Sequence, residues 1–198
     1  MTEIKNTCSW PAGRPLDIHY HNHEWGVPLH DDQKLFESLV LDAFQAGLSW
    51  STILKKRENF RTAFDGFDPK IIADYSEAKV MELMSDAGII RNQLKIRSTI
   101  TNAQLFLKVQ QEFGSFDKYI WQFTQHKTKV NTWKTMAEIP ATSPESDAMS
   151  KDLKKRGFKF VGSTICYAFM QAAGMINDHL VSCFRYEEVQ KMEVGRQE

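Results

Sequence analysis

The chain has 198 residues, and its 25 lysines and arginines balance 25 aspartates and glutamates, so the formal net charge is zero. This length is typical of one domain with a real core, and a hydrophobic content of 42% excludes disorder as the dominant state. Since non-specific affinity for nucleic acid comes from lysine and arginine, zero net charge argues against a polycationic protein that coats it. A local basic patch is still compatible with neutrality.

No apolar run approaches the roughly 18 residues of a membrane span, and the N-terminal residues lack the apolar core of a secretory signal. The three cysteines, Cys8, Cys166 and Cys183, are too few for a disulfide framework. We therefore expect a cytoplasmic protein without membrane association. Cys166 lies on an apolar helical face and is expected to be a buried thiol.

Helical periodicity runs through almost the whole chain and predicts an all-α fold, a single domain over residues 1–198 with irregular termini. The helices are predicted to begin, in chain order, at Asp31, Ser49, Asp68, Ser76, Asn92, Phe116, Ser146 and Ser163. Glycines are predicted to end most of them, namely Gly47, Gly88, Gly114, Gly157 and Gly174. Residues 125–145 are expected to be a long connection.

Two candidate metal ligands stand near each end of the chain, Cys8 and His21 at the start and His179 and Cys183 at the end. The spacing of four in the last pair places both side chains on one face of a helical turn. Two thiolates and two imidazoles match a closed tetrahedral zinc site, which would join the two terminal segments. The alternative is four unrelated residues, since three other histidines crowd the N-terminal stretch.

Four aromatic residues, Trp10, Tyr20, Trp25 and Trp50, flank an apolar helical stretch that contains Asp42. A carboxylate in such a stretch is costly unless it faces a partner, a cavity or water. One interpretation is a pocket for a flat, cationic heterocycle, held by stacking, cation–π attraction and a hydrogen bond to the carboxylate. The other is that the tryptophans belong to the core and Asp42 points outward.

A basic stretch lies between the last two predicted helices and is the candidate contact with a DNA backbone. Its basic residues are Lys151, Lys154, Lys155, Arg156 and Lys159, against the single acid Asp152. A helix is predicted to begin near Gly162 and Ser163, and the free N–H groups of a helix N-terminus bind phosphate. The pattern favours a helix-hairpin-helix over about 146–173; the alternative is an ordinary turn with a solvated lysine face. Basic residues at 55–57 and 91–97 would extend the patch or simply lie on the surface.

Several motifs together resemble those of the DNA-3-methyladenine glycosylase I family, in order along nearly the whole chain. They are Cys8–Trp10, Tyr20–Pro28, Gln45–Trp50, Leu54–Arg57, Gly88–Asn92, Leu153–Gly162 and Asn177–His179. The resemblance implies a helix-hairpin-helix enzyme of base-excision repair. Such an enzyme hydrolyses the N-glycosidic bond of 3-methyladenine in double-stranded DNA with alkylated bases. It releases free 3-methyladenine and leaves an abasic site.

The resemblance also assigns the site residues. It implies one structural zinc ion held by Cys8, His21, His179 and Cys183, so that segments 8–21 and 179–183 form a zinc-joined annex. It implies a base pocket made by Trp10, Tyr20, Trp25 and Trp50, and a DNA-backbone contact that we expect at Lys159, Gly162 and Ser163. The family's base-contacting residue is usually glutamate; Asp42 at that position is one methylene shorter. The hairpin departs from the common pattern of two glycines one residue apart, because four residues separate Gly157 from Gly162.

Methylation at N3 makes adenine cationic, so the base leaves as a neutral molecule and strong acid catalysis is not needed. We expect Asp42 to act mainly through electrostatics. No lysine nucleophile is evident, so we expect a monofunctional, monomeric glycosylase. One alternative is a non-catalytic DNA-damage binding module of the same fold. Another is a zinc hydrolase, which would need an open coordination position that four protein ligands do not leave.

Overall fold

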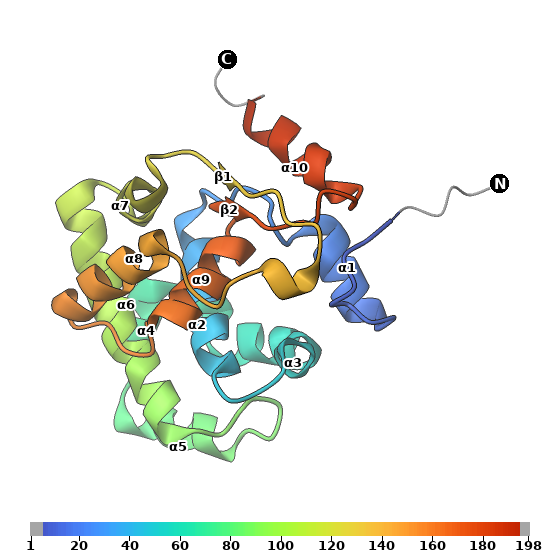
Figure 1. Cartoon of the computed structure of the whole chain (residues 1–198). Coiled ribbons are helices and arrows are strands. Elements are labelled where there is room, and N and C mark those ends of the chain that lie inside the picture. Colours follow the sequence, from blue (N-terminus) through green and yellow to red (C-terminus); the bar gives the residue numbers. More distant parts are fainter. Residues whose placement is uncertain (1–5, 195–198) are drawn as a thin grey trace.

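The computed structural model describes residues 6–194, and the predicted all-α class is confirmed as a mostly helical fold (Figure 1). The α-helices are α1 (Pro15–His23), α2 (Asp32–Gln45), α3 (Trp50–Ala63), α4 (Pro69–Ala73), α5 (Glu77–Ser85), α6 (Gln93–Phe113), α7 (Phe116–Trp121), α8 (Pro144–Arg156), α9 (Ser163–Ala172) and α10 (Arg185–Val194). Three 3₁₀ turns, η1 (Asp65–Phe67), η2 (Gln122–Thr124) and η3 (Met136–Glu138), lie between them. No helix in the described range is long and apolar enough to cross a membrane.

The predicted connection contains one short strand, which pairs with a second short strand near the end of the chain. β1 (Lys129–Val130) pairs in parallel with β2 (Ile176–Asn177), with Lys129 opposite Ile176. The pairing ties the segment before α8 to the segment after α9. Alternation in two residues is too short to predict a strand, so the sequence pattern could only hint at it.

The predicted caps of the first half of the chain are confirmed, because each side chain accepts a hydrogen bond from a backbone N–H of the first turn. These caps are Asp31 of α2, Ser49 of α3, Asp68 of α4, Ser76 of α5 and Asn92 of α6. Gly114 ends α6 in the left-handed conformation, as predicted.

Some predicted boundaries are wrong. Helix α8 begins before the predicted start, because Ser143 is its cap and Ser146 closes a capping box by bonding back to it. Helix α9 is capped by Gly162 without a side-chain bond, so Ser163 is its first residue rather than its cap. Helix α5 ends at Ser85, before Gly88.

The terminal segments are also more regular than predicted, since both contain a helix, α1 and α10. Helix α1 has no apolar stripe, because the side chains that it buries are Asp17, Tyr20 and His21. A helix whose buried face is polar and aromatic escapes a prediction from apolar periodicity. Figure 1 shows α1 in blue and α10 in red on the same side of the molecule.

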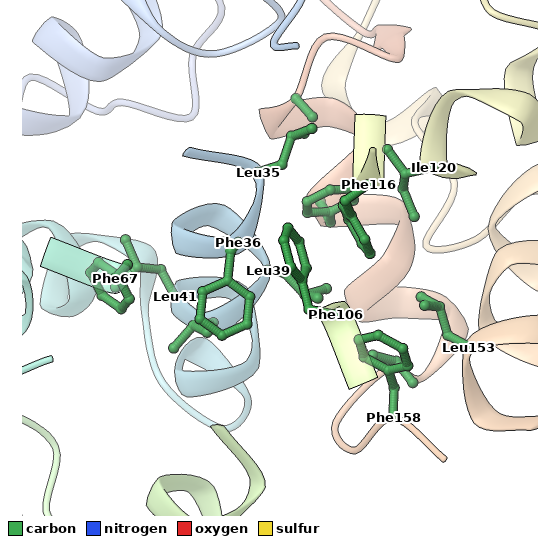
Figure 2. Close-up of a cluster of buried hydrophobic side chains, with 14 of the residues drawn as sticks. Leu35, Phe36, Leu39, Leu41, Phe67, Phe106, Phe116, Ile120, Leu153 and Phe158 are labelled. Atoms are coloured by element: carbon green, nitrogen blue, oxygen red, sulfur yellow. The ribbon is translucent and has the colours of Figure 1, made fainter. Parts of the chain in front are cut away.

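The main hydrophobic core surrounds α2, which packs against α3, α6, α7 and α9. Leu35, Phe36 and Leu39 of α2 are at most 1% exposed. Figure 2 shows them facing side chains of α6, α7 and α8, among them Phe106, Phe116 and Leu153. This core fixes α2, and with it the position of every residue that α2 presents on its other side.

A second, smaller cluster of buried side chains lies between the two ends of the chain. Its members are Cys8, Tyr20, Trp25, Leu54, Leu180 and Cys183, with Trp10, Trp50, Trp133, Met136 and Phe184 packed against them. Six of the nine residues that the sequence singled out for metal or base binding belong to this second cluster, which is therefore where the candidate site is sought.

Candidate functional site

The structure brings the four predicted metal ligands together from both ends of the chain. Cys8, His21, His179 and Cys183 are all buried, and their ligand atoms lie within 4.8 Å of one another. The Sγ atom of Cys183 is 3.5 Å from Nε2 of His21 and 3.6 Å from Nδ1 of His179, which is in turn 3.8 Å from Sγ of Cys8. Tetrahedral zinc with its usual bond lengths separates sulfur from nitrogen by roughly 3.6 Å. The group is therefore of the right size to hold one metal ion.

The second nitrogen of each imidazole is also engaged. Nε2 of His179 lies 3.0 Å from the carbonyl oxygen of Trp25 and donates to it, which leaves Nδ1 as the lone-pair nitrogen toward the thiols. Nδ1 of His21 is 2.7 Å from Oδ1 of Asn22, which leaves Nε2 facing the cluster. Outer hydrogen bonds of this kind fix the tautomer of a metal-binding histidine.

The environment of the two thiols favours a thiolate. The hydrogen bond from the Cys8 thiol holds the pKa of Cys183 well below its ordinary value, against the opposing effect of burial. The shared proton stays with Cys8, whose pKa is raised by its hydrogen bond to Cys183 and by burial. A buried thiolate beside imidazole nitrogens is the donor set that a zinc ion prefers.

The last two ligands lie on a turn and not, as the spacing suggested, on a helix. Residues 179–183 precede α10, and the turn is closed by a bond from the N–H of Cys183 to the carbonyl of Leu180. Gly26 lets His179 come close, because a Cβ atom there would stand 2.9 Å from the Nε2 atom of His179. Glycine at this position has a φ of 79°, so both conformation and space favour it.

The aromatic residues do form a pocket, beside the metal cluster. A cavity of about 200 Å³ is lined by the four predicted aromatic residues and Asp42, together with Gln45, Met136, Ile139, Ala168, Gln171 and Ala172. The rings of Tyr20 and Trp50 are 5.1 Å apart, and those of Trp10 and Trp25 are 5.5 Å apart at 70°. We call this cavity the base pocket. It is smaller than the roughly 300 Å³ at which pockets for drug-sized ligands begin.

Asp42 lines this cavity and does not point outward to solvent, so the alternative of an outward-facing Asp42 is wrong. Its side chain is buried, with 4% exposure. Burial raises its pKa to about 8, and a hydrogen bond from Ser38 partly opposes that shift. The carboxyl group is therefore mostly protonated in the empty pocket at neutral pH, and a positive charge beside it would favour the ionised form.

Two indole N–H groups of the pocket residues are left over. The Nε1 atoms of Trp10 and Trp50 are buried and have no hydrogen-bond partner among the described residues. Buried donors are ordinarily paired. A ligand with ring nitrogens that accept hydrogen bonds would satisfy them.

Sequence reasoning missed part of the pocket wall. Met136 and Ile139 come from η3 and the residue after it, in the segment that the sequence predicts to be a connection. Gln171 of α9 is held by a 2.8 Å bond to Asp178, which also accepts from Tyr167 and Trp133. Asp178 stands within a motif of the resemblance, but no local pattern showed that it gathers these three side chains.

Leu48 is a second residue that sequence reasoning passed over. It lies 41% exposed in the turn between α2 and α3. The pocket residues Gln45 and Trp50 flank it on either side. A large apolar side chain that is exposed between two pocket-lining residues makes no contribution to the core.

The basic stretch covers the last turns of α8 and the turn over residues 157–162 that joins α8 to α9, and of its basic residues only Lys159 lies in that turn. Asn102 of α6 anchors this turn, because its side chain bonds both to the N–H and to the carbonyl of Lys159, at 2.8 and 3.0 Å. Gly162 has open space where a Cβ would be. The side chain of Ser163 bonds to Ser146 and Asp147 of α8. The turn therefore presents backbone N–H groups of α9 and the exposed lysines to solvent.

Several of the basic residues are already paired. Arg156 bonds to Glu112 and Asp152 and lies over the ring of Tyr119, so it is not available to a phosphate. Arg57 is paired with Glu24 and Arg97 with Glu77. Four exposed lysines remain in the basic stretch itself, namely Lys151, Lys154, Lys155 and Lys159, and Lys55 and Arg91 outside it are also exposed.

Comparison with known proteins gives one answer. A family model described as methyladenine glycosylase matches residues 10–186. The chain is 51% identical over 179 residues to DNA-3-methyladenine glycosylase 1 of Escherichia coli (strain K12), covering 90% of this chain and 96% of that protein. It is 44% identical to DNA-3-methyladenine glycosylase of Haemophilus influenzae, covering 89% and 95%.

Solved structures agree. A crystal structure of a 3-methyladenine DNA glycosylase I superposes with a TM-score of 0.88 at 49% identity, covering 90% of this chain and 98% of that one. The structure that describes 3-methyladenine recognition by 3-methyladenine DNA glycosylase I from Staphylococcus aureus has a TM-score of 0.88 at 36% identity, covering 91% and 96%.

Proposed function

Because this chain belongs to the methyladenine glycosylase family, we propose that it removes 3-methyladenine from alkylated DNA by hydrolysis of the N-glycosidic bond. It is a DNA-3-methyladenine glycosylase that acts in base-excision repair and leaves an abasic site. The observation that carries the proposal is the base pocket, in which the buried Asp42 lies among aromatic rings with two unpaired indole donors.

The pocket suits a flat, positively charged purine. Aromatic rings on several sides supply stacking and cation–π attraction. The indole N–H groups of Trp10 and Trp50 are donors for ring nitrogens, and the Asp42 carboxylate is an acceptor for an amino group. The DNA must expel the base from its stack to reach this site, which costs a few kcal/mol and least for damaged pairs.

Asp42 gives the pocket its preference for a cationic base. Normal adenine is neutral and would leave the buried carboxyl protonated, whereas a 3-methylated base carries the charge that stabilises the carboxylate. As the glycosidic bond breaks, positive charge passes from the base to the sugar, and the nearby carboxylate favours that change. The base departs as a neutral molecule, and water adds to the sugar carbon and releases its proton to solvent.

The DNA contact is assigned to the turn between α8 and α9, which we propose is a helix-hairpin-helix. Lys159 supplies charge, and the N–H groups at Gly162 and Ser163 are donors to phosphate at the start of α9. We propose double-stranded DNA as the substrate, with Leu48 as a wedge that fills the place of the expelled base. No lysine lines the base pocket among the described residues, so the enzyme is proposed to be monofunctional.

One zinc ion is proposed at Cys8, His21, His179 and Cys183. With four protein ligands it has no open position, so its part is structural: it would supply cross-links between the two ends of the chain. The same closed donor set disfavours a catalytic zinc hydrolase. A single domain, a monomeric state and a cytoplasmic location remain expectations from the sequence.

The competing function is a damage-binding module without turnover. Incubation with methylated DNA followed by chromatography of the supernatant separates the two. Release of 3-methyladenine supports the enzyme, whereas retention of methylated DNA without release favours the binding module. Trapping of an enzyme–DNA adduct with borohydride would contradict the monofunctional mechanism.

A further inference from the structure

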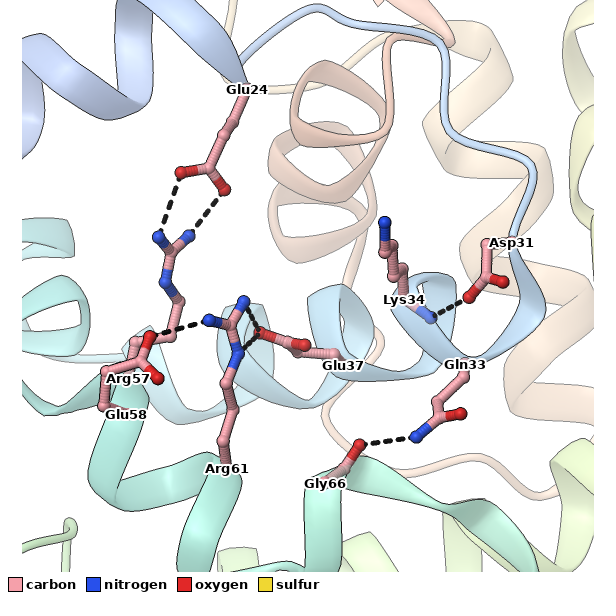
Figure 3. A network of polar contacts seen from close by, with 9 residues as sticks. All are labelled: Glu24, Asp31, Gln33, Lys34, Glu37, Arg57, Glu58, Arg61 and Gly66. Atoms are coloured by element: carbon pink, nitrogen blue, oxygen red, sulfur yellow. Dashed lines mark hydrogen bonds and ion pairs between the residues drawn. The ribbon is translucent and has the colours of Figure 1, made fainter.

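A second cavity lies behind the base pocket. It measures about 310 Å³, and Tyr20, Trp50 and Ala172 line both cavities. Its other walls come from α1, the segment after α1, and the parts of α2 and α3 that carry charged pairs. Figure 3 shows these pairs: Glu24 meets Arg57 through two bonds of 2.6 and 2.9 Å, and Arg61 meets Glu37 and Glu58. The second cavity therefore has several charged side chains in its wall, whereas among the described residues Asp42 is the one ionisable acid or base that lines the aromatic base pocket besides Tyr20.

One hydrogen bond crosses the wall between the two cavities. Ser38 lines the second cavity, and Asp42 lines the base pocket. The Oγ atom of Ser38 donates to Oδ2 of Asp42 over 3.4 Å. The two residues are one helical turn apart on α2, so their side chains stand on the same face. The short side chain of aspartate keeps the carboxylate near its own helix, where the preceding turn can reach it.

From this arrangement, and resting on the proposed function, we propose that Ser38 is a positioning residue for Asp42. Its hydroxyl holds the carboxylate from the side of the second cavity and favours the ionised form that binds the cationic base. A serine hydroxyl donates more strongly to an ionised carboxylate than to the oxygen of a neutral acid, so the bond stabilises the charged state more than the neutral one. Ser38 does not itself line the base pocket.

The other ionisable groups near Asp42 do not stabilise its carboxylate. From α1, burial and then the negative charge of Asp42 raise the pKa of the Tyr20 phenol. From α9, Cys166 feels it too, and burial with that charge raises the pKa of the thiol to about 12. Both groups are therefore neutral at pH 7. The nearest ion pair, Glu24 with Arg57, acts on Tyr20, whereas the shift in the pKa of Asp42 itself has two causes, burial and Ser38.

The test follows the ionisation of Asp42 directly, by the pH titration of its carboxyl carbon in NMR spectra of the free protein. Ser38→Ala should move the midpoint upward by about half a pH unit, and Ser38→Thr, which keeps the hydroxyl, should return it to the wild-type value. Ser85→Ala is the matched control, because the Ser85 hydroxyl likewise donates within its own helix, to the carbonyl of Met81 one turn before it on the surface of α5. An unchanged midpoint in Ser38→Ala, or no recovery in Ser38→Thr, would overturn the proposal.

A second readout separates this proposal from the function it rests on. The pH profile of single-turnover base release should shift in Ser38→Ala in the same direction as the titration, with release about two- to threefold slower at pH 7. If the wild-type protein released no base while the titration shifted, the proposed function would fail and the role of Ser38 would stand. Base release by both proteins with identical pH profiles would contradict the role of Ser38 alone.

Discussion

The imidazole of His179 packs against the indole of Trp25, with ring centroids 4.6 Å apart at 73°, and its Nε2 donates to the Trp25 carbonyl. One residue belongs to the metal cluster and the other to the base pocket. The metal cluster and the base pocket therefore share a wall. In the sequence they are two separate motifs, and the metal ligands Cys8 and His179 are 171 residues apart. Anything that disorders the metal cluster should reach the pocket through this contact.

Loss of the metal should therefore weaken both stability and base binding. We expect about one zinc per chain in protein purified without added zinc, and Cys183→Ser to lose it. The variant should melt at a lower temperature and bind free 3-methyladenine less tightly, because Trp25 loses its support. Cys166→Ala is the control, since this buried thiol lies outside the cluster. Equal metal content in Cys183→Ser and wild-type protein would contradict the assignment.

Replacement of Asp42 should separate stability from activity. The pKa of about 8 in the folded protein exceeds the ordinary 3.8, so the stabilisation from a protonated Asp42 is full below pH 4 and is lost as the pH rises to 8. Asp42→Asn has no such loss. Relative to wild type, the variant should gain at least about 1 kcal/mol of unfolding free energy between pH 5 and pH 8. Denaturant titrations at both pH values measure this, and a constant difference would show that Asp42 is not buried as a neutral acid.

Leu48→Ala should slow base release from duplex DNA without changing how the base pocket binds free base. A wedge acts only when a base is expelled, so we expect slower base release from duplex DNA and unchanged binding of free 3-methyladenine. Ile71→Ala provides a control, because Ile71 is similarly exposed on α4 and far along the chain from the pocket residues. Equal losses of free-base binding and release would indicate that Leu48 supports the pocket instead.

Gly162→Ala should disturb the phosphate contact without disturbing the fold. The added methyl group meets no atom within 4 Å, and the backbone φ of −63° suits alanine. We expect unchanged thermal stability but weaker binding to DNA of any sequence, because the methyl group occupies the approach of the phosphate. Lys159→Ala should reduce the slope of log affinity against log salt by about one unit. A fall in stability without a change in DNA affinity would contradict this role of the turn.

Local patterns predicted much of this molecule because they act over a few residues. Asp31 and Ser49 cap helices through bonds that span three residues, and the apolar stripe of α2 faces the core. Caps and apolar stripes depend only on residues a few positions apart in the sequence. The predicted start of α8 is wrong because two serines, Ser143 and Ser146, share the capping box and either is compatible with the cap.

The remaining features depend on contacts between distant segments. The sequence could not show that Met136 and Ile139 line the base pocket, because their segment has no periodicity. It also could not show that Arg156 pairs with Glu112 on another helix. The direction of Asp42 was open for the same reason. An apolar run is compatible with a carboxylate that faces either solvent or a cavity, and the packing of α1, α3 and α9 around it decides.

Single-turnover release of 3-methyladenine from methylated duplex DNA, compared for wild-type protein and Asp42→Asn, tests the central claim most directly. We predict that wild-type protein releases the base well above a buffer control and leaves abasic sites in uncut strands. Asp42→Asn should bind the same DNA but release the base at least tenfold more slowly, a loss of about 1.4 kcal/mol or more. Equal rates for the two proteins would remove Asp42 from the mechanism, and no release by wild-type protein would contradict the glycosylase itself.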